Sequence, residues 1–175
     1  MNSSLPVIFT VGHSTRTLGE LVEVLRAHGV TRVVDVRTIP RSSHNPQFNH
    51  ETLSKGLHNR HLSYRLMKSL GGLRHARSDS TNTGWRNASF RGFADYMQTP
   101  AFGEALEKLL KLAEQKPTAI MCAEAVPWRC HRSLIADALT VRGYEVRDIM
   151  SVTSAKPHAL MPMARVHGQQ VTYPG

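Results

Sequence analysis

Short runs of apolar residues alternate along the chain with segments in which apolar residues recur at helical spacing. Runs typical of buried strands are found at 7–12, 32–37, 118–123 and 144–150, and 62–66 is a weaker example. Segments with the helical pattern are found at 18–29, 51–58, 90–97, 100–115 and 127–142. Strands and helices alternate in this way when parallel strands are joined by helical crossovers. The pattern therefore predicts an α/β fold with a mostly parallel central sheet flanked by helices.

Two segments lie outside this alternation. Residues 38–50 (TIPRSSHNPQFNH) are rich in turn-forming and polar residues and predict a loop long enough to carry function. Residues 163–173 predict a small C-terminal hairpin that turns at His167-Gly168. No repeat or linker-like segment interrupts the 175 residues, a length typical of one domain. We therefore expect a single domain over residues 1–175.

Composition narrows the class of protein further. Hydrophobic residues make up 41% of the chain and charged residues 20%, which is enough apolar material for a core and disfavours wholesale disorder. No apolar run approaches the roughly 20 residues of a membrane span, and no basic segment precedes the first apolar run as in a secretory signal. We therefore expect a cytoplasmic protein without a membrane partner. Its two cysteines are better interpreted as thiols or ligands than as a disulfide.

The positive charge is concentrated in one part of the chain. The net charge is +9, and residues 37–93 alone contain ten basic and two acidic side chains, together with five of the ten histidines. This concentration favours an anionic partner such as a phosphate, a nucleotide or a nucleic acid, although a solvated basic surface explains it equally well. Trp85 lies in the polar part of this segment and is expected to contact such a partner.

Polar side chains follow three of the predicted strands at their carboxyl ends. The clusters run from Thr10 to Ser14, from Asp35 to Ser42 and from Cys122 to Arg132. Ligands of open α/β sheets bind outside the carboxyl ends of the strands. We therefore expect the three clusters to converge on one pocket at that edge of the sheet.

The densest cluster contains Cys122, Glu124, Cys130, His131 and Arg132. A cysteine becomes nucleophilic when a cation, a histidine or a helix N-terminus lowers its pKa, and all three follow Cys122 in the sequence. The cluster therefore indicates a thiolate or a general acid/base pair. Two structural interpretations remain open: Cys122 is simply a small buried core residue, or Arg132 and Glu124 form an ion pair that orders the loop.

The other two clusters offer groups that bind anions. Gly12 and Ser14 lie at a strand-to-helix turn, where backbone amides and the helix dipole favour negative charge, and His13 is neither a usual cap nor a core residue. Asp35 and Arg37 project to the same face, so the arginine fork is placed to hold a phosphate or a carboxylate. Structural alternatives remain open for both clusters. In the first, Gly12 only allows the turn, and the hydroxyl of Ser14, Thr15 or Thr17 only caps the helix. In the second, Asp35 and Arg37 form an ion pair that only orders the loop.

The spacings differ from those of several well-known sites. Cys122 and Cys130 are separated by seven residues, unlike the C-x₂₋₄-C pairs of structural zinc sites, and no HExxH spacing accompanies them. A metal site that adds His13 or His44 is thus weakly supported, and the sequence indicates no particular cofactor. There is no GxxxxGK[ST] loop, and six residues separate Cys122 from Arg129 where the Cys-x₅-Arg loop of cysteine phosphatases has five.

Five motifs together resemble the domain of unknown function 488 family: TVGHS at 10–14, DVRTIPRS at 35–42, FRGFADYM at 90–97, MCAEAVPWRCHR at 121–132 and HALMPMARVHGQQVTYP at 158–174. The resemblance covers nearly the whole chain and implies a single α/β domain. It implies special positions at Gly12, His13, Ser14, Asp35, Arg37, Pro40, Ser42, Cys122, Glu124, Cys130, His131 and Arg132. Similar chains commonly have histidine where this chain has Asp148. The resemblance does not imply a particular reaction.

Two hypotheses from different classes follow. The first is an enzyme that acts on a phosphorylated or nucleobase-containing substrate. Its catalytic residues are Cys122, Glu124, His131 and His13, and its substrate- or anion-binding residues are Gly12, Ser14, Asp35, Arg37, Ser42, Cys130 and Arg132. The second is a noncatalytic nucleic-acid-binding module that uses residues 37–93, for which the sequence contains no zinc-finger, RNA-recognition or KH signature.

Overall fold

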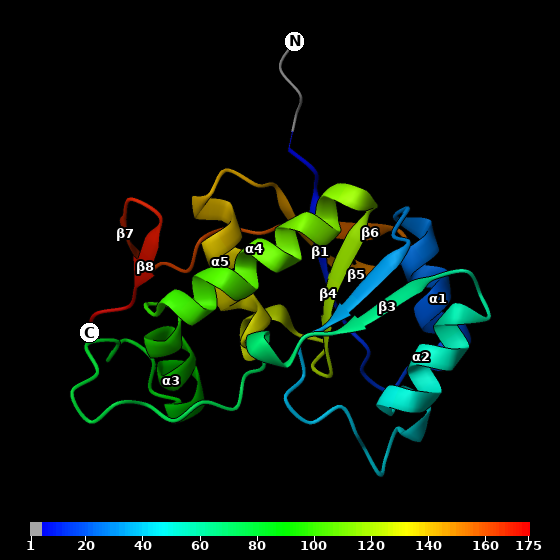
Figure 1. Cartoon of the computed structure of the whole chain (residues 1–175), viewed down its shortest axis with the longest axis horizontal. Helices are drawn as coiled ribbons and strands as arrows, with labels where there is room; N and C mark the ends of the chain where they lie inside the picture. Colours follow the sequence, from blue (N-terminus) through cyan, green and yellow to red (C-terminus); the bar gives the residue numbers. More distant parts are fainter. Residues whose placement is uncertain (1–4) are drawn as a thin grey trace.

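A six-stranded sheet forms the centre of the molecule in the computed structural model, which describes residues 5–175 (Figure 1). Its strand order is β3-β2-β4-β1-β5-β6. The strands are β1 (Ile8–Gly12), β2 (Arg32–Asp35), β3 (Ser63–Leu66), β4 (Thr118–Cys122), β5 (Val146–Ser151) and β6 (Ser154–Pro157). All neighbouring strands are parallel except β5 and β6, which pair antiparallel. The predicted α/β fold class is therefore confirmed.

Helices cover both faces of this sheet. The α-helices are α1 (Leu18–Ala27), α2 (His50–His58), α3 (Ala88–Tyr96), α4 (Pro100–Gln115) and α5 (Arg132–Val141). Three short 3₁₀ helices are η1 (Pro46–Phe48), η2 (Lys68–Leu70) and η3 (Pro127–Arg129). Helices α1 and α2 lie on one side of the sheet and α3, α4 and α5 on the other (Figure 1). The small hairpin of β7 (Arg165–His167) and β8 (Gln170–Thr172) confirms the prediction for the C-terminus.

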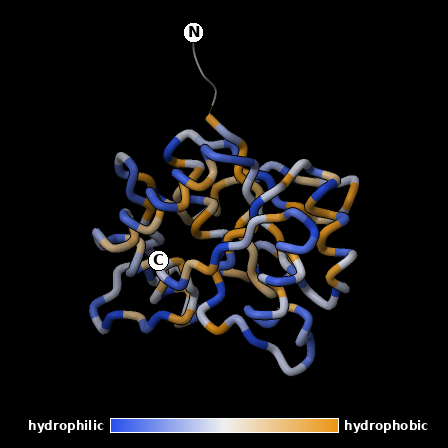
Figure 2. The backbone as a smooth tube through the Cα atoms, turned by 45° about the vertical axis from the view of Figure 1, so that its right-hand side comes forward, coloured by the Kyte–Doolittle hydropathy of each residue, from blue (hydrophilic) through white to orange (hydrophobic). Residues whose placement is uncertain are grey.

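Alternation along the strands divides the core in two. Val33 packs with α1 and α2, whereas the next residue, Val34, packs with α3, α4 and α5. Both faces are covered, so the strands are apolar almost throughout, as expected for a parallel sheet. Figure 2 shows the hydrophobic segments running through the middle of the molecule and the hydrophilic ones in its outer loops. This alternation also decides on which face each polar residue at a strand end lies.

Local sequence signals explain where two of the helices begin. Thr17 and Glu20 form a capping box at the start of α1, because each side chain bonds the other residue's backbone amide. Thr99 caps α4 through the amide of Phe102, and Pro100 occupies the first turn, where no backbone donor is needed. Of the hydroxyls near the first strand, Thr17 therefore caps the helix.

Three differences from the sequence-based prediction concern the edge strand or the elements that carry the polar clusters. The helix expected over 127–142 consists of η3 and then α5, which begins only at Arg132 because Cys130 is extended, with φ −134° and ψ 146°. Strand β2 ends at Asp35, so Arg37 belongs to the following loop. Strand β6 was not predicted, because its sequence SAKP lacks alternating apolar residues and it pairs only at the edge of the sheet.

Candidate functional site

The three polar clusters meet at one edge of the sheet, since β2, β4 and β1 are neighbours and parallel. Their side chains, however, project to opposite faces. Asp35 and Arg37 lie on the side of α1 and α2, whereas Cys122 and Arg132 lie on the side of α5. The structure therefore forms two groups of residues at this edge, which we call the arginine cluster (His13, Asp35, Arg37, Phe48, Tyr64) and the thiol cluster (Cys122, Glu124, Cys130, His131, Arg132).

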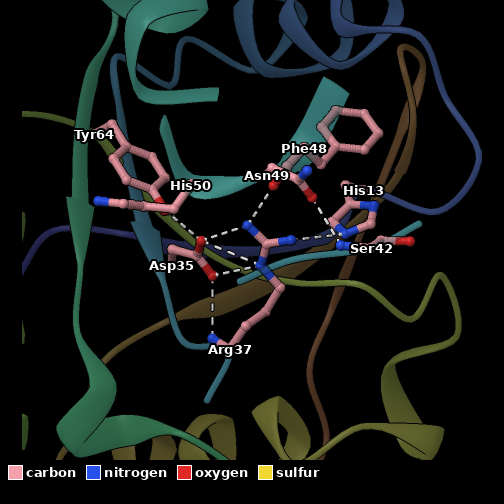
Figure 3. Close-up of polar contacts among 8 residues, drawn as sticks. All are labelled: His13, Asp35, Arg37, Ser42, Phe48, Asn49, His50 and Tyr64. Carbon is pink, nitrogen blue, oxygen red and sulfur yellow. Dashed lines mark hydrogen bonds and ion pairs between the residues drawn. The ribbon is translucent and has the colours of Figure 1, made fainter. Parts of the chain in front are cut away.

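Asp35 holds Arg37 in the arginine cluster (Figure 3). The Arg37 guanidinium donates to both carboxylate oxygens, with Nη2 2.7 Å from Oδ2 and Nε 2.9 Å from Oδ1. The Tyr64 hydroxyl donates to the same carboxylate and accepts from His50 Nδ1. Burial and the adjacent Asp35 charge raise the pKa of Tyr64, so the phenol keeps its proton. Asp35 is thus occupied as an acceptor and acts as the support that orients Arg37.

The His13 imidazole is also held by Arg37. Its Nδ1 lies 2.8 Å from the carbonyl of Ser14, so Nδ1 carries the proton and Nε2 accepts from Arg37 Nη1 at 3.3 Å. The ring stacks on Phe48 with centroids 4.3 Å apart. Burial, together with the Arg37 charge, lowers the pKa of His13. His13 is therefore neutral, and its one lone pair faces Arg37 rather than a substrate.

The backbone amides after Gly12 are already paired. His13 donates to the carbonyl of Cys122 at 2.9 Å, and Ser14 donates to the carbonyl of Ala123 at 2.9 Å. These two amides therefore bind the loop after β4 rather than an anion. A Cβ on Gly12 would lie 1.8 Å from the carbonyl oxygen of Glu124, so glycine allows the two segments to approach closely.

Ser42 orders the loop between β2 and α2. Its amide donates to the Asn49 side chain at 2.7 Å, and its hydroxyl accepts from the amide of Asn45 at 3.1 Å. These bonds close the loop around Phe48, whose carbonyl accepts from Arg37 at 2.7 Å. The loop after β2 thus completes the arginine cluster.

Two cysteines and an arginine form the centre of the thiol cluster. The Cys122 and Cys130 sulfurs are 2.6 Å apart, and Arg132 Nη1 lies 2.7 Å from the Cys122 sulfur. The amide of Arg132, the first residue of α5, also donates to the Cys130 sulfur at 3.4 Å. Both cysteines are buried free thiols. A cation and a helix N-terminus are thus directed at the same pair of sulfurs.

Arg132 is a completely buried cation. Its other bonds go to neutral acceptors, namely the carbonyls of Glu124 and Ala125 and the hydroxyl of Thr10. Within residues 5–175 no carboxylate oxygen lies within 4.0 Å of its guanidinium. The alternative in which Arg132 forms an ion pair with Glu124 is thus wrong, because Arg132 bonds the Glu124 backbone carbonyl instead. A buried charge needs a partner of opposite charge, and Cys122 is the ionisable group that Arg132 touches.

The two thiols have opposite acidity. Burial raises the pKa of Cys122, but the Cys130 thiol and the Arg132 cation outweigh this effect and lower the pKa below its ordinary value. The hydrogen bond to Cys122, together with burial, raises the pKa of Cys130. Cys122 is therefore the more acidic of the two thiols, and Cys130 donates a hydrogen bond to its sulfur.

His131 joins α5 to the neighbouring loops. Its Nε2 donates to the carbonyls of Val36 at 3.0 Å and Leu70 at 2.9 Å, so Nδ1 is the acceptor and faces the Cys130 sulfur at 3.6 Å. Burial lowers the pKa of His131 to about 4. The imidazole is therefore neutral and contacts Cys130 rather than Cys122.

A polar network that was not predicted from the sequence lies behind the thiol cluster. Thr10 accepts from Arg132 at 3.2 Å and donates to Asp148, whose second oxygen lies 3.6 Å from His158. His158 also bonds Asp137 at 2.7 Å. Asp148 therefore supports Arg132 through Thr10. The fold brings β1, α5 and β5 together, so residues that lie far apart in the sequence form one network.

Two cavities open at this edge of the sheet. One has a volume of about 270 Å³ and is lined by His13, Ser14, Arg37, Arg41 and Ser42, among others. The other has a volume of about 320 Å³ and is lined by Cys122, Arg129, Cys130 and His131, among others. Both cavities also contact Arg37, Ile39, Ala123 and Glu124. The expected single pocket is therefore replaced by two cavities that share a wall.

Trp85 corrects one prediction from the sequence. Its side chain is 7% exposed and packs edge-on against Phe90 and Tyr173. Tyr173, from the end of the chain, covers it, so Trp85 is a core residue rather than a contact for a partner. Within the described part of the chain no group of three or more His, Cys, Asp or Glu side chains is arranged to hold a metal ion. No helix there is long and apolar enough to cross a membrane.

Fold and site together define an α/β protein with a buried pair of thiols at the carboxyl edge of a parallel sheet. The chain belongs to the family of the domain of unknown function DUF488, whose model matches residues 17–139. This match includes Asp35, Arg37 and the whole thiol cluster. Searches of curated proteins and of solved structures found no match.

Proposed function

We propose that the protein is an enzyme whose nucleophile is the Cys122 thiolate. The observation that carries this proposal is the buried Arg132 cation, which lies 2.7 Å from the Cys122 sulfur and has no carboxylate partner in the described chain. A thiolate held in this way is ready to attack an electrophilic atom, because the thiolate and not the thiol is the reactive form. Arg132 holds the charge, and Cys130 donates a hydrogen bond to it.

We further propose a small anionic substrate, phosphorylated or containing a nucleobase. Arg37 and Arg41 line the first cavity, Arg37 and Arg129 line the second, and Glu124 is the acidic residue that both cavities contact. The Nε and Nη2 groups of Arg37 donate to the Asp35 carboxylate and the Phe48 carbonyl. Nη1 carries two hydrogens, of which one bonds His13 and the other remains for a ligand. The cavity volumes are near the lower end of the range for small-molecule sites, roughly 300–1,000 Å³. They favour a small molecule over a polymer in this site.

Alkylation with iodoacetamide tests the nucleophile. We expect Cys122 to be alkylated near neutral pH, with the modified residue identified by peptide mass spectrometry, and Cys130 to react more slowly. The Cys130→Ser variant keeps Cys122 and serves as the matched control, whereas Cys122→Ser should lose the rapid reaction. Equal, slow alkylation of both thiols in the folded protein would overturn the assignment of Cys122 as nucleophile.

Protection experiments test the substrate class separately. Inorganic phosphate, ribose 5-phosphate and adenosine monophosphate are added before iodoacetamide, and at least one should slow the alkylation of Cys122. The same protection should be weaker in Arg37→Met, which removes the charge and keeps an extended side chain. Rapid alkylation that none of these compounds slows would reject the anionic substrate and leave the nucleophile in place.

A groove at the edge strand β3 favours a second candidate, the binding of a polyanion such as nucleic acid. It has a volume of about 900 Å³ and is lined by Arg32, Lys55, Arg65, His50, His58 and His61, with Glu51 as its acid. Binding by such cations weakens steeply with salt, because counterions are released from the nucleic acid. Labelled DNA and RNA, single- and double-stranded, should bind at low salt and lose affinity in Lys55→Ala. Absence of binding at low salt would eliminate this candidate.

A further inference from the structure

The thiol cluster contains a second sulfur that attack by Cys122 alone does not require. Cys130 interrupts what would otherwise be one helix, and its extended backbone turns its side chain toward Cys122. The two free thiols are in direct contact, so a disulfide between them requires no large movement of either segment. The fold thus holds the pair close to bonding distance in the reduced protein.

The state of each thiol depends on the other. The Cys122 thiolate accepts the hydrogen of Cys130 and so keeps Cys130 protonated. If Cys122 becomes neutral by oxidation, this acceptor disappears, while the Arg132 cation and the first amide of α5 remain beside the sulfurs. Both then favour the Cys130 thiolate. Oxidation of the first thiol therefore activates the second.

Access to the pair restricts the oxidant to a small molecule. Cys122 is 4% exposed and Cys130 6% exposed, and both line the same cavity of about 320 Å³. A disulfide on another protein cannot reach sulfurs at this depth without unfolding the loop, because exchange needs in-line approach of a sulfur. A hydroperoxide is small enough to enter the cavity. The environment therefore suits a low-molecular-weight oxidant.

We propose that Cys122 and Cys130 form a catalytic dithiol that reduces small hydroperoxides and cycles through a Cys122–Cys130 disulfide. This inference rests on the proposed nucleophile and adds to it a reaction class and a role for Cys130. Cys122 reacts with the peroxide, and Cys130 resolves the oxidised intermediate. Arg132 contacts the Cys122 sulfur that reacts.

The reaction balances in two steps. The Cys122 thiolate attacks the terminal oxygen of ROOH, the S–O bond forms, the O–O bond breaks, and RO⁻ leaves as ROH with the proton of Cys130. Cys122 is now a sulfenic acid and Cys130 a thiolate. The Cys130 thiolate attacks the Cys122 sulfur, the S–S bond forms, and hydroxide leaves as water with a proton from solvent. Two electrons pass from the two sulfurs to the peroxide, and a small external dithiol returns them by exchange at the disulfide.

Intact-mass measurement with hydrogen peroxide tests the proposal directly. The full chain is reduced, freed of reductant and treated with an equimolar amount of hydrogen peroxide. The wild-type protein should lose the mass of two hydrogen atoms and both titratable thiols, and dithiothreitol should restore them. Cys130→Ser should instead gain one oxygen at Cys122, which dimedone traps. Cys122→Ser should form no intramolecular disulfide, and any oxygen that it gains should be at Cys130.

Turnover gives a second readout. With dithiothreitol as reductant, the wild-type protein should consume hydrogen peroxide above the uncatalysed rate, and Cys122→Ser should return consumption to that rate. Circular dichroism melts of both serine variants establish that they fold, and the wild-type mass shift is diagnostic even if a variant does not.

Two results would overturn the inference. One is a wild-type protein that keeps both thiols after peroxide treatment, and the other is oxidation of Cys122 beyond the sulfenic acid while Cys130 stays a free thiol. If Cys122 is nevertheless alkylated rapidly by iodoacetamide, the proposed nucleophile stands and only the peroxide reaction fails. If Cys122 is inert to both reagents, both proposals fail together.

Discussion

Replacing Arg132 with methionine removes the buried cation from the Cys122 sulfur while keeping a long side chain. In the wild-type protein Arg132 and Cys130 lower the pKa of Cys122 to about 7, against the opposing effect of burial. Without the guanidinium, burial is opposed by Cys130 and by the smaller effect of the Glu124 backbone, so the pKa should rise to at least the ordinary value of ~8.5. A shift of at least about 1.5 units corresponds to roughly 2 kcal/mol of lost thiolate stabilisation.

The pH dependence of iodoacetamide alkylation measures this shift. The titration midpoint should move from near pH 7 to at least about pH 8.5. At pH 7 the thiolate fraction would fall from about one half to ~3%, but a more basic thiolate is a better nucleophile, so the rate itself falls only about threefold. The midpoint is therefore the sharper readout.

Two further variants control this experiment. Arg132→Lys keeps the charge and should retain part of the shift, although its single ammonium cannot reproduce the bonds of the fork. Arg147→Met removes an exposed cation that pairs with Glu145 and should leave the midpoint unchanged. If folded Arg132→Met titrates like the wild-type protein, Arg132 does not stabilise the thiolate and the reasoning is refuted.

Three predictions concern stability. Gly12→Ala should destabilise the protein by about 1–3 kcal/mol in urea unfolding, because the alanine Cβ would lie 1.8 Å from the Glu124 carbonyl oxygen. Gly103→Ala is the control, since a Cβ there would have no atom of another residue within 4 Å, and it should be neutral or stabilising. Burial of His158 lowers its pKa, but Asp137 and Asp148 outweigh this effect and raise the pKa to about 9. The charged imidazolium therefore contributes up to about 3 kcal/mol of stability below pH ~6.5, and this contribution is lost as the pH rises through about 9. The difference in unfolding free energy between wild type and His158→Gln should shrink over that range. Tyr64→Phe removes the hydroxyl that donates to the buried aspartate of β2 and should cost roughly 1–3 kcal/mol, measured by thermal unfolding; an unchanged melting temperature would contradict this.

The strands and helices of the parallel sheet were predictable because each carries its own pattern of apolar residues. Runs such as 118–123 are buried on both faces and read as continuous apolar stretches, and 100–115 has a full helical stripe. Strand β6 has no such pattern, because it forms at the edge of the sheet from polar residues that β5 holds in place. The burial of Trp85 was not predictable either, because Tyr173 covers it from a distant part of the chain.

The edge that carries the candidate site was also predictable, but the grouping of its residues was not. Parallel strands place their carboxyl ends together, so the sequence located the clusters correctly. The face to which each side chain points depends on the register between strands, which no single strand encodes. The Thr10–Asp148–His158 network likewise depends on contacts between β1 and β5, and the motifs that contain Thr10 and His158 do not indicate that these residues meet.

The wall between the two cavities links their chemistry thermodynamically. The carbonyls of Glu124 and Ala125 face Arg132, while both residues also line the cavity beside His13. A ligand that shifts this segment changes the hydrogen bonds of the guanidinium and with them the proton affinity of Cys122. Linkage is reciprocal, so protonation or oxidation of Cys122 must change the affinity for that ligand by the same factor. If ligand binding moves this short backbone segment, occupancy of the first cavity and the chemical state of the thiol form one coupled equilibrium.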